Sequence, residues 1–173
     1  MPRIPVEIIY MQMAYQTAKL SYAERRRVGC IIVKDEQIVS FGYNGTPHGF
    51  DNACEETETE TVYYENPDIA MDLIEEHGFD CENGCCTKET TSTKREVLHA
   101  ESNAITKLAK STMTSDGADL YTTTAPCFDC AKLIIQAGIK RVYYSEDYRD
   151  MSGVELLNKA NIEVKEVICW NAE

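Results

Sequence analysis

Residues 126–140 read PCFDCAKLIIQAGIK, and this stretch predicts a helix that lies between two strands. Pro126 suits the first turn of a helix, and Gly138 suits its end. Runs typical of short strands lie on either side, at 119–123 and 141–145. Strands and helices that alternate in this way indicate an α/β fold.

The segments further out complete the fold prediction. Periodicity and β-branched runs predict further helices and strands, with a hairpin between the first two strands. These elements are expected at 5–21, 28–34, 38–43, 99–110, 152–160 and 163–168. Ser152 and Glu155 match a capping box at the start of the last helix. We therefore expect a three-layer α/β/α sandwich with a five-stranded mixed sheet.

An acidic insertion interrupts this pattern. The chain has 173 residues and a mass of 19.5 kDa, which corresponds to a single domain over 1–173. Residues 51–96 lack clean periodicity except for a helical pattern around 68–76. Eleven acidic residues and no Lys or Arg lie between Cys54 and Glu82. We interpret this region as the insertion, and a solvated lid over a pocket is one interpretation of its role.

Charge and hydropathy exclude several classes of protein. The net charge is −12, and nearly all of it comes from the insertion. The remainder lacks the basic footprint that long nucleic acid requires, whereas one small anion on a local basic cluster is compatible. No apolar run approaches the ~18 residues of a membrane helix, and the N-terminal stretch has no cleavage site. We expect no membrane association and a cytoplasmic location.

The eight cysteines of the chain indicate a metal site. In a cytoplasmic protein, cysteines favour metal binding or catalysis over disulfides. Cys127 and Cys130 should lie on one face of a helix start, where the helix N-terminus favours thiolates. His99 begins a neighbouring helix and can add a nitrogen. This ligand set suits zinc, and three protein ligands leave the fourth position for water, as in catalytic sites.

Glu101 completes the chemistry. It lies two residues after His99 and so does not share its helical face. We expect it beside the metal, where it can take a proton from water and pass it on. A lone C-x-x-C pair is equally compatible with a closed structural zinc site. Together, residues 99–101 and 126–130 match the H-x-E…P-C-x-x-C signature of zinc deaminases, which favours catalysis.

The chain resembles the deoxycytidylate (dCMP) deaminase family, within the cytidine deaminase-like superfamily, from about residue 6 to residue 167. The zinc motifs identify only the superfamily. The loop Gly42–Pro47 (GYNGTP) and the long match over 126–140 narrow the resemblance to dCMP deaminases. Further matches lie at 28–32 (VGCII) and 99–105 (HAESNAI).

This resemblance implies the hydrolysis of dCMP to dUMP and ammonia, which supplies dUMP for thymidylate synthesis. It implies one catalytic Zn²⁺ per protomer on His99, Cys127 and Cys130, with Glu101 moving protons between water, the ring nitrogen N3 and the leaving amine.

The resemblance also implies substrate contacts. These are expected from Asn44, Ala100, Pro126 and Tyr148. Plain turn chemistry is the alternative for Asn44, and an ordinary surface aromatic is the alternative for Tyr148.

Regulation is a further implication. Many family members are hexamers that dCTP with Mg²⁺ activates and dTTP inhibits, through a site near the Gly-Tyr-Asn-Gly loop. We therefore expect a homo-oligomer, with a hexamer favoured, and effector contacts at Gly42, Tyr43 and Gly45. The basic cluster Arg25, Arg26 and Arg27 is expected to hold a phosphate of the substrate or effector, with a solvated surface as the alternative.

Some family members bind a second, structural zinc. The residues available for such a site are Cys81, Cys85 and Cys86, with Cys54 or His48. We favour unpaired or packed thiols over this second zinc. Cys30 lies in a predicted strand and is expected in the core. Nothing in the sequence assigns a role to Cys169.

Alternative functions share parts of this pattern. A polynucleotide base deaminase would use the same zinc chemistry but would need a basic channel with interleaved aromatics, which the charge disfavours. A deaminase that acts on dCTP is a further alternative, because dCTP has the same base and sugar as dCMP. A catalytically inactive zinc module used for assembly is a third alternative. Glu101 argues against it, because such a module needs no group that moves protons.

Overall fold

A five-stranded mixed sheet forms the centre of the fold, in the order β2-β1-β6-β7-β8. The computed structural model describes residues 3–64 and 66–168. Strands β2, β1 and β6 are antiparallel, whereas β6, β7 and β8 are parallel. The strands are β1 (Gly29–Lys34), β2 (Gln37–Tyr43), β6 (Asp119–Thr124), β7 (Arg141–Glu146) and β8 (Glu163–Glu166). The expected five-stranded mixed sheet is therefore confirmed.

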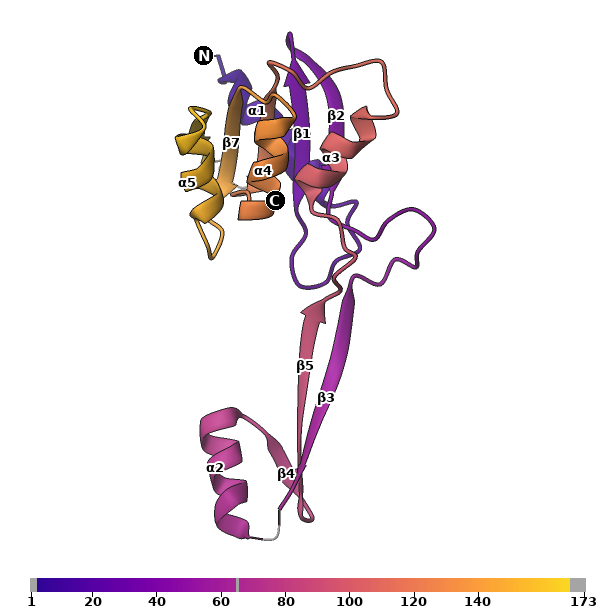
Figure 1. Cartoon of the computed structure of the whole chain (residues 1–173), viewed down its shortest axis with the longest axis vertical. Helices are drawn as coiled ribbons and strands as arrows, with labels where there is room; N and C mark the ends of the chain where they lie inside the picture. Colours follow the sequence, from indigo (N-terminus) through magenta and orange to yellow (C-terminus); the bar gives the residue numbers. More distant parts are fainter. Residues whose placement is uncertain (1–2, 65, 169–173) are drawn as a thin grey trace.

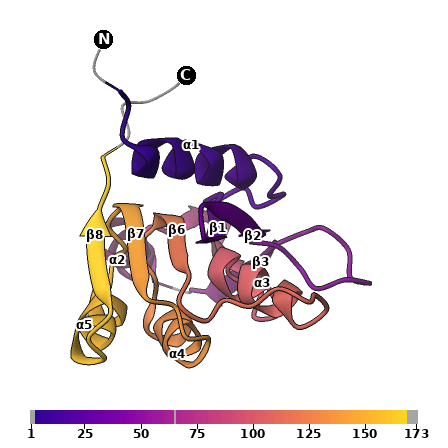
Figure 2. The same ribbon diagram turned by 90° about the horizontal axis from the view of Figure 1, so that it is seen from above.

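Helices cover both faces of this sheet (Figure 2). Helix α1 (Val6–Ala18) lies alone on one face. On the other face lie α3 (Ala100–Leu108), α4 (Phe128–Gln136) and α5 (Ser152–Lys159). This arrangement is the predicted three-layer α/β/α sandwich. No helix among residues 3–64 and 66–168 is both long enough and apolar enough to cross a membrane.

Alternation along the strands separates two cores. Cys30 and Ile32 point to the face covered by α3, α4 and α5, and Ile31 points to α1. This follows from the two-residue period of a strand. Cys30 is fully buried, as expected.

Gly42 brings strand β2 and helix α3 into close contact. A Cβ atom at this position would overlap the carbonyl of Ala100 and lie 2.5 Å from the backbone nitrogen of Ala104. Only glycine allows this approach. The first turn of α3, which follows His99, is thereby fixed against the sheet.

The insertion is an arm that extends away from the body of the molecule (Figure 1). It consists of β3 (Glu55–Tyr63) and β5 (Cys85–Thr93) as an antiparallel ribbon, with α2 (Pro67–His77) and β4 (Asp80–Glu82) at the far end. The predicted helix near 68–76 is confirmed. The sequence did not predict the strands of the arm, because most of both faces of β3 is exposed and no apolar period marks it.

The arm cysteines do not gather into the alternative zinc site. Cys81 and Cys86 face each other across β4 and β5 and form a disulfide. The expectation of unpaired or merely packed thiols is therefore wrong for these two residues. Cys54 lies at the root of the arm, whereas Cys85 pairs with Tyr63 at the other end of the ribbon, roughly 27 Å away at about 3.4 Å per residue. Cys169 lies outside the described residues.

The start of α5 differs from the predicted capping box. Ser152 is already helical, and Met151 occupies the cap position without a side-chain hydrogen bond. The Asp150 carboxylate instead accepts a hydrogen bond from the Ser152 backbone N–H at 2.9 Å. The helix itself lies where the sequence predicted it.

Candidate active site

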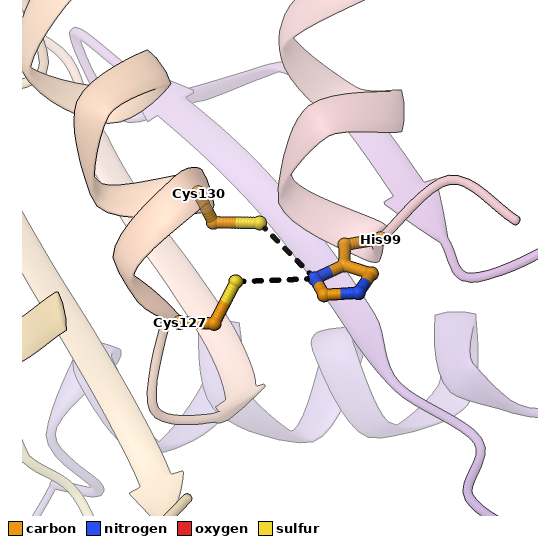
Figure 3. A group of neighbouring side chains, drawn as sticks. All are labelled: His99, Cys127 and Cys130. Carbon is orange, nitrogen blue, oxygen red and sulfur yellow. Dashed lines mark hydrogen bonds between the residues drawn. The ribbon is translucent and has the colours of Figure 1, made fainter. Parts of the chain in front are cut away.

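Two helix starts bring His99, Cys127 and Cys130 together (Figure 3). His99 occupies the N-cap position of α3 and Cys127 that of α4, while Cys130 lies in the first turn of α4. The His99 Nδ1 atom lies 3.4 Å from the Cys127 sulfur and 3.3 Å from the Cys130 sulfur. The structure therefore gathers the three predicted metal ligands at one point.

This group fits zinc. A tetrahedral ion about 2.3 Å from sulfur and about 2.0–2.1 Å from nitrogen would hold a sulfur and a nitrogen about 3.6 Å apart. The observed separations of 3.3 and 3.4 Å are close to that value. The ligand atoms all lie within 4.8 Å of one another. Two sulfurs and one imidazole nitrogen form the ligand set of a zinc site with one open position.

The electrostatics of the group favour a thiolate. The hydrogen bond with Cys130, followed by that with His99, lowers the pKa of the Cys127 thiol to about 4. The hydrogen bond with Cys127 raises the pKa of His99. A thiolate is the form in which cysteine binds a metal.

Glu101 is buried beside the metal ligands. Its side chain is 4% exposed, and the Cys130 thiol donates a hydrogen bond to its Oε2 atom over 3.6 Å. Burial raises the pKa of the carboxyl to about 7. A nearby cation would lower it from there. The group is thus placed to gain and lose a proton beside the metal.

A cavity of about 740 Å³ opens in front of this group. The predicted residues that line it are Arg25, Arg26, Asn44, His99, Ala100, Glu101, Cys127 and Tyr148. Arg27 does not line it, because its Nε atom donates to the Ala23 carbonyl at 3.2 Å. Pro126 is fully buried and lies outside the lining.

The predicted effector residues hold the first turn of α3. The Tyr43 carbonyl accepts a hydrogen bond from the Asn103 side chain at 2.8 Å. Gly45 and Leu98 exchange two backbone hydrogen bonds, of 3.1 and 2.9 Å. Together with the close packing of Gly42, these contacts fix the chain on both sides of His99.

The cavity is also lined by cationic residues that the sequence did not predict as part of the site. Lys94 and Arg95 come from the root of the arm, and Arg149 follows β7. Only the folded chain brings these separate segments together. The one available signal was the Lys94-Arg95 pair just before the His-Ala-Glu motif.

Comparison with known proteins identifies the family. The model of the cytidine and deoxycytidylate deaminase zinc-binding region matches residues 6–146. The chain belongs to this family. The predicted family is therefore confirmed, and the His/Cys/Cys group lies in the region that the zinc-binding model covers.

Relatives and a solved structure support this identification. The deoxycytidylate deaminase of Enterobacteria phage T4 is 35% identical, over 89% of this chain and 86% of that protein. ComE operon protein 2 of Bacillus subtilis is 33% identical, over 96% of this chain and 74% of that protein. The dCMP deaminase of cyanophage S-TIM5, solved with dCMP and dUMP, superimposes with a TM-score of 0.72 at 34% identity. That match covers 96% of this chain and all of the phage chain.

Proposed function

We propose that this deaminase hydrolyses dCMP to dUMP and ammonia and thereby supplies dUMP for thymidylate synthesis. The observation that carries the proposal is a set of cationic side chains lining the same cavity as Glu101 and the metal ligands. The protein has a net charge of −12, so a local basic cluster favours an anionic substrate. Phage relatives named deoxycytidylate deaminase support the same substrate.

The chain's own residues account for the proton transfers. His99, Cys127 and Cys130 would hold one zinc ion, which supplies Lewis acidity and a nucleophilic water at neutral pH. Glu101 takes a proton from the attacking water and delivers it to N3 of the cytosine ring. It then passes the second proton to the leaving amine, so that the oxygen remains on C4 and ammonia departs. Its burial keeps the carboxyl away from bulk water.

The phosphate of dCMP would bind the cationic side of the cavity. Arg25, Arg95 and Arg149 line it together with Lys94, which pairs with Asp51 at 3.4 Å. Arg26 is already engaged by Glu146 at 2.7 Å. A guanidinium can bind a phosphate through two parallel hydrogen bonds. Ala100 and Tyr148, which also line the cavity, would contact the nucleoside.

Substrate competition tests the proposal. Ammonia release should be measured from dCMP, CMP, dCTP, deoxycytidine and a cytosine-containing single strand, with zinc content determined in parallel. We expect preferred turnover of dCMP at one zinc per protomer. Preferred turnover of dCTP or of the strand would instead assign one of the alternative substrates, and no turnover of any would refute the activity.

We further propose that dCTP with Mg²⁺ activates the enzyme and dTTP inhibits it, with contacts near Gly42, Tyr43, Gly45 and the cluster Arg25–Arg27. The family resemblance supports this regulation. Kinetics with dCMP, with and without each triphosphate, test it. Hyperbolic rates that neither triphosphate changes would refute it.

We also propose a homo-oligomer, with a hexamer favoured, in the cytoplasm. Val6, Ile9 and Met13 on the outer face of α1 are all more than a third exposed, and such apolar stripes favour contacts between subunits. Light scattering after gel filtration measures the assembly. The chain would form one deaminase domain over 1–173 with the insertion at about 51–96, since the arm's first and last paired residues, Glu55 and Thr93, are neighbours.

A further inference from the structure

A single carboxylate at the end of β7 joins helix α1 to a side chain that lines the cavity. The Glu146 Oε1 atom accepts a hydrogen bond from the Tyr15 hydroxyl of α1 at 3.0 Å. Its Oε2 atom accepts a hydrogen bond from the Arg26 guanidinium at 2.7 Å, and Arg26 lines the cavity. Each oxygen of this carboxylate therefore holds a side chain from a different segment of the chain.

The backbone of Glu146 is fixed beside the metal ligands. Its carbonyl accepts a hydrogen bond from the Ala125 N–H at 2.8 Å, and it pairs with Thr124 across β6 and β7. Thr124 and Ala125 are buried and line the cavity, and the proposed ligand Cys127 follows two residues later. The carboxylate is therefore attached to an ordered part of the sheet, at the edge where the cavity opens.

The Arg26 side chain depends on Glu146 for its position. No helix or strand includes residues 19–28, and the Arg26 side chain is 42% exposed. Within residues 3–64 and 66–168, Glu146 is the one hydrogen-bond partner of the Arg26 guanidinium. A long arginine side chain loses rotamer entropy when it binds a ligand. The bond to Glu146 limits that freedom beforehand, and a group fixed in advance binds at a lower entropic cost.

The pairing leaves Arg26 able to bind a phosphate as well. A guanidinium has five N–H donors in a planar fork, and one hydrogen bond connects this guanidinium to Glu146. We propose that Glu146 is a positioning residue, which holds the Arg26 guanidinium where its remaining N–H groups face the substrate phosphate. This inference rests on the proposed dCMP deaminase function.

A counterion role is the competing explanation, and it predicts the opposite sign. If Glu146 only neutralised Arg26, its removal would leave the cavity more positive and would strengthen phosphate binding. If Glu146 positions Arg26, its removal weakens phosphate binding as long as Arg26 is present. Once Arg26 is absent, the loss of Glu146 has no guanidinium to misplace. The two residues must therefore be changed both separately and together.

The experiment is a double-mutant cycle on the zinc-loaded protein, with Glu146→Ala, Arg26→Ala and the double variant. KM is measured for dCMP and for deoxycytidine, which lacks the phosphate, or Ki against dCMP where a compound is not turned over. We expect Glu146→Ala to raise KM for dCMP about three- to fivefold and Arg26→Ala to raise it about tenfold. In the Arg26→Ala background, Glu146→Ala should not raise it further. The value for deoxycytidine and kcat for dCMP should change less than about twofold, since the phosphate contact alone is affected.

Glu163→Ala is the matched control. Glu163 forms an exposed ion pair with Lys165, as Glu146 does with Arg26, but it lies on β8 and does not line the cavity. Its loss should leave KM for both compounds unchanged.

Tyr15→Phe provides a second route if Glu146→Ala does not fold. This variant keeps the ring and the charge of Glu146 and removes the hydrogen bond to Oε1. It should raise KM for dCMP about two- to threefold, the usual effect of a weak polar contact, and have no effect in the Arg26→Ala background.

Three results would overturn the proposal. A KM for dCMP that falls in Glu146→Ala would assign the counterion role instead. A rise of equal size in both backgrounds, or for deoxycytidine as well, would show a merely structural effect. Unchanged kinetics in Arg26→Ala would remove Arg26 from phosphate recognition. A parent that does not deaminate dCMP refutes the proposed function and this inference with it, whereas an additive cycle in an active parent refutes the inference alone.

Discussion

Glu101 bears the proton chemistry of the proposed reaction, because it is a buried carboxyl beside the metal ligands. Glu101→Gln keeps the shape of the side chain and removes its ability to shuttle protons. We expect kcat to fall about 10²–10⁴-fold, the usual contribution of general acid–base catalysis. Zinc content and melting temperature should stay near the parent values, since Glu101 is not among the proposed ligands.

Glu155→Gln serves as the control for this prediction, because Glu155 is exposed on α5, away from the cavity. Its kinetics should match those of the parent. A Glu101→Gln enzyme with more than a tenth of the parental kcat would show that another group moves the protons.

Arg95 and Arg27 provide a matched pair for phosphate recognition. Arg95 lines the cavity, whereas Arg27 bonds its own segment through Ala23. A charge-assisted hydrogen bond contributes about 1.5–3 kcal/mol, so Arg95→Ala should raise KM for dCMP about 10–100-fold. KM for deoxycytidine should stay within twofold. Steady-state kinetics of both variants are decisive, and an equal effect of Arg27→Ala would contradict the assignment.

The metal ligands could be predicted from sequence, and most of the phosphate site could not. His99, Cys127 and Cys130 lie in short motifs whose spacing alone indicates zinc. Lys94 and Arg149 reach the cavity from segments more than 50 residues apart. The spacing of residues along the sequence does not predict that these two side chains line one cavity, because only the packed fold brings them together.

Gly42 allows strand β2 to pack closely against helix α3, and this contact fixes the position of the site. In Gly42→Ala the new methyl group would meet backbone atoms of Ala100 and Ala104 that cannot rotate away. We expect a loss of about 1–3 kcal/mol in the free energy of unfolding, as for other overpacked contacts. Zinc affinity should fall as well, since His99 begins α3. Denaturant unfolding and zinc titration measure the two effects.

Gly45→Ala is the control within the same loop. A Cβ atom there would come no closer than 4.0 Å to the side chain of Tyr43, and the backbone has no positive φ. Its stability should stay within about 0.5 kcal/mol of the parent, as at other unstrained surface positions. Equal destabilisation by both substitutions would show that the contact with α3 is not the cause.

Elements of the body follow from sequence because each buries apolar side chains, on both faces in β1 and on one face in α4. This burial gives β1 a continuous β-branched run and gives α4 a helical apolar period. Strands β3 and β5 bury almost nothing over most of their length, so no apolar period predicts them. The alternation of Thr and Glu over 57–61 was a usable strand signal, since β-branched Thr favours strands.

The direction of the arm is a property of the whole molecule. Its acidic residues suggested a lid, but the ribbon extends away from the body (Figure 1), so this interpretation is wrong. Only the root, with Glu55 and residues 92–95, lines the cavity. No local pattern encodes this direction, because it depends on where the two strands leave the body.

Shortening the arm tests this division between root and ribbon. Glu56 and Ser92 face each other across the ribbon, so an Asn-Gly turn can replace 57–91 as a two-residue hairpin connection between them. Glu55, Lys94 and Arg95 remain in place in the shortened protein. We therefore expect kcat/KM for dCMP to stay within about threefold of the parent, which corresponds to less than about 1 kcal/mol of activation free energy. Steady-state kinetics and gel filtration of the shortened protein measure activity and assembly.

The shortened protein with Glu55→Ala is the control for the root. Glu55 accepts hydrogen bonds from the segment that carries Arg25, so its loss should raise KM for dCMP although the distal arm is already absent. Hydrogen bonds to a charged group contribute about 1.5–3 kcal/mol, which sets the expected rise at about tenfold or more. If the shortened protein alone loses tenfold in kcat/KM while its assembly is unchanged, the distal arm must act on the cavity directly. If it loses activity together with assembly, the arm serves catalysis through contacts between subunits, and the division proposed for a single chain fails.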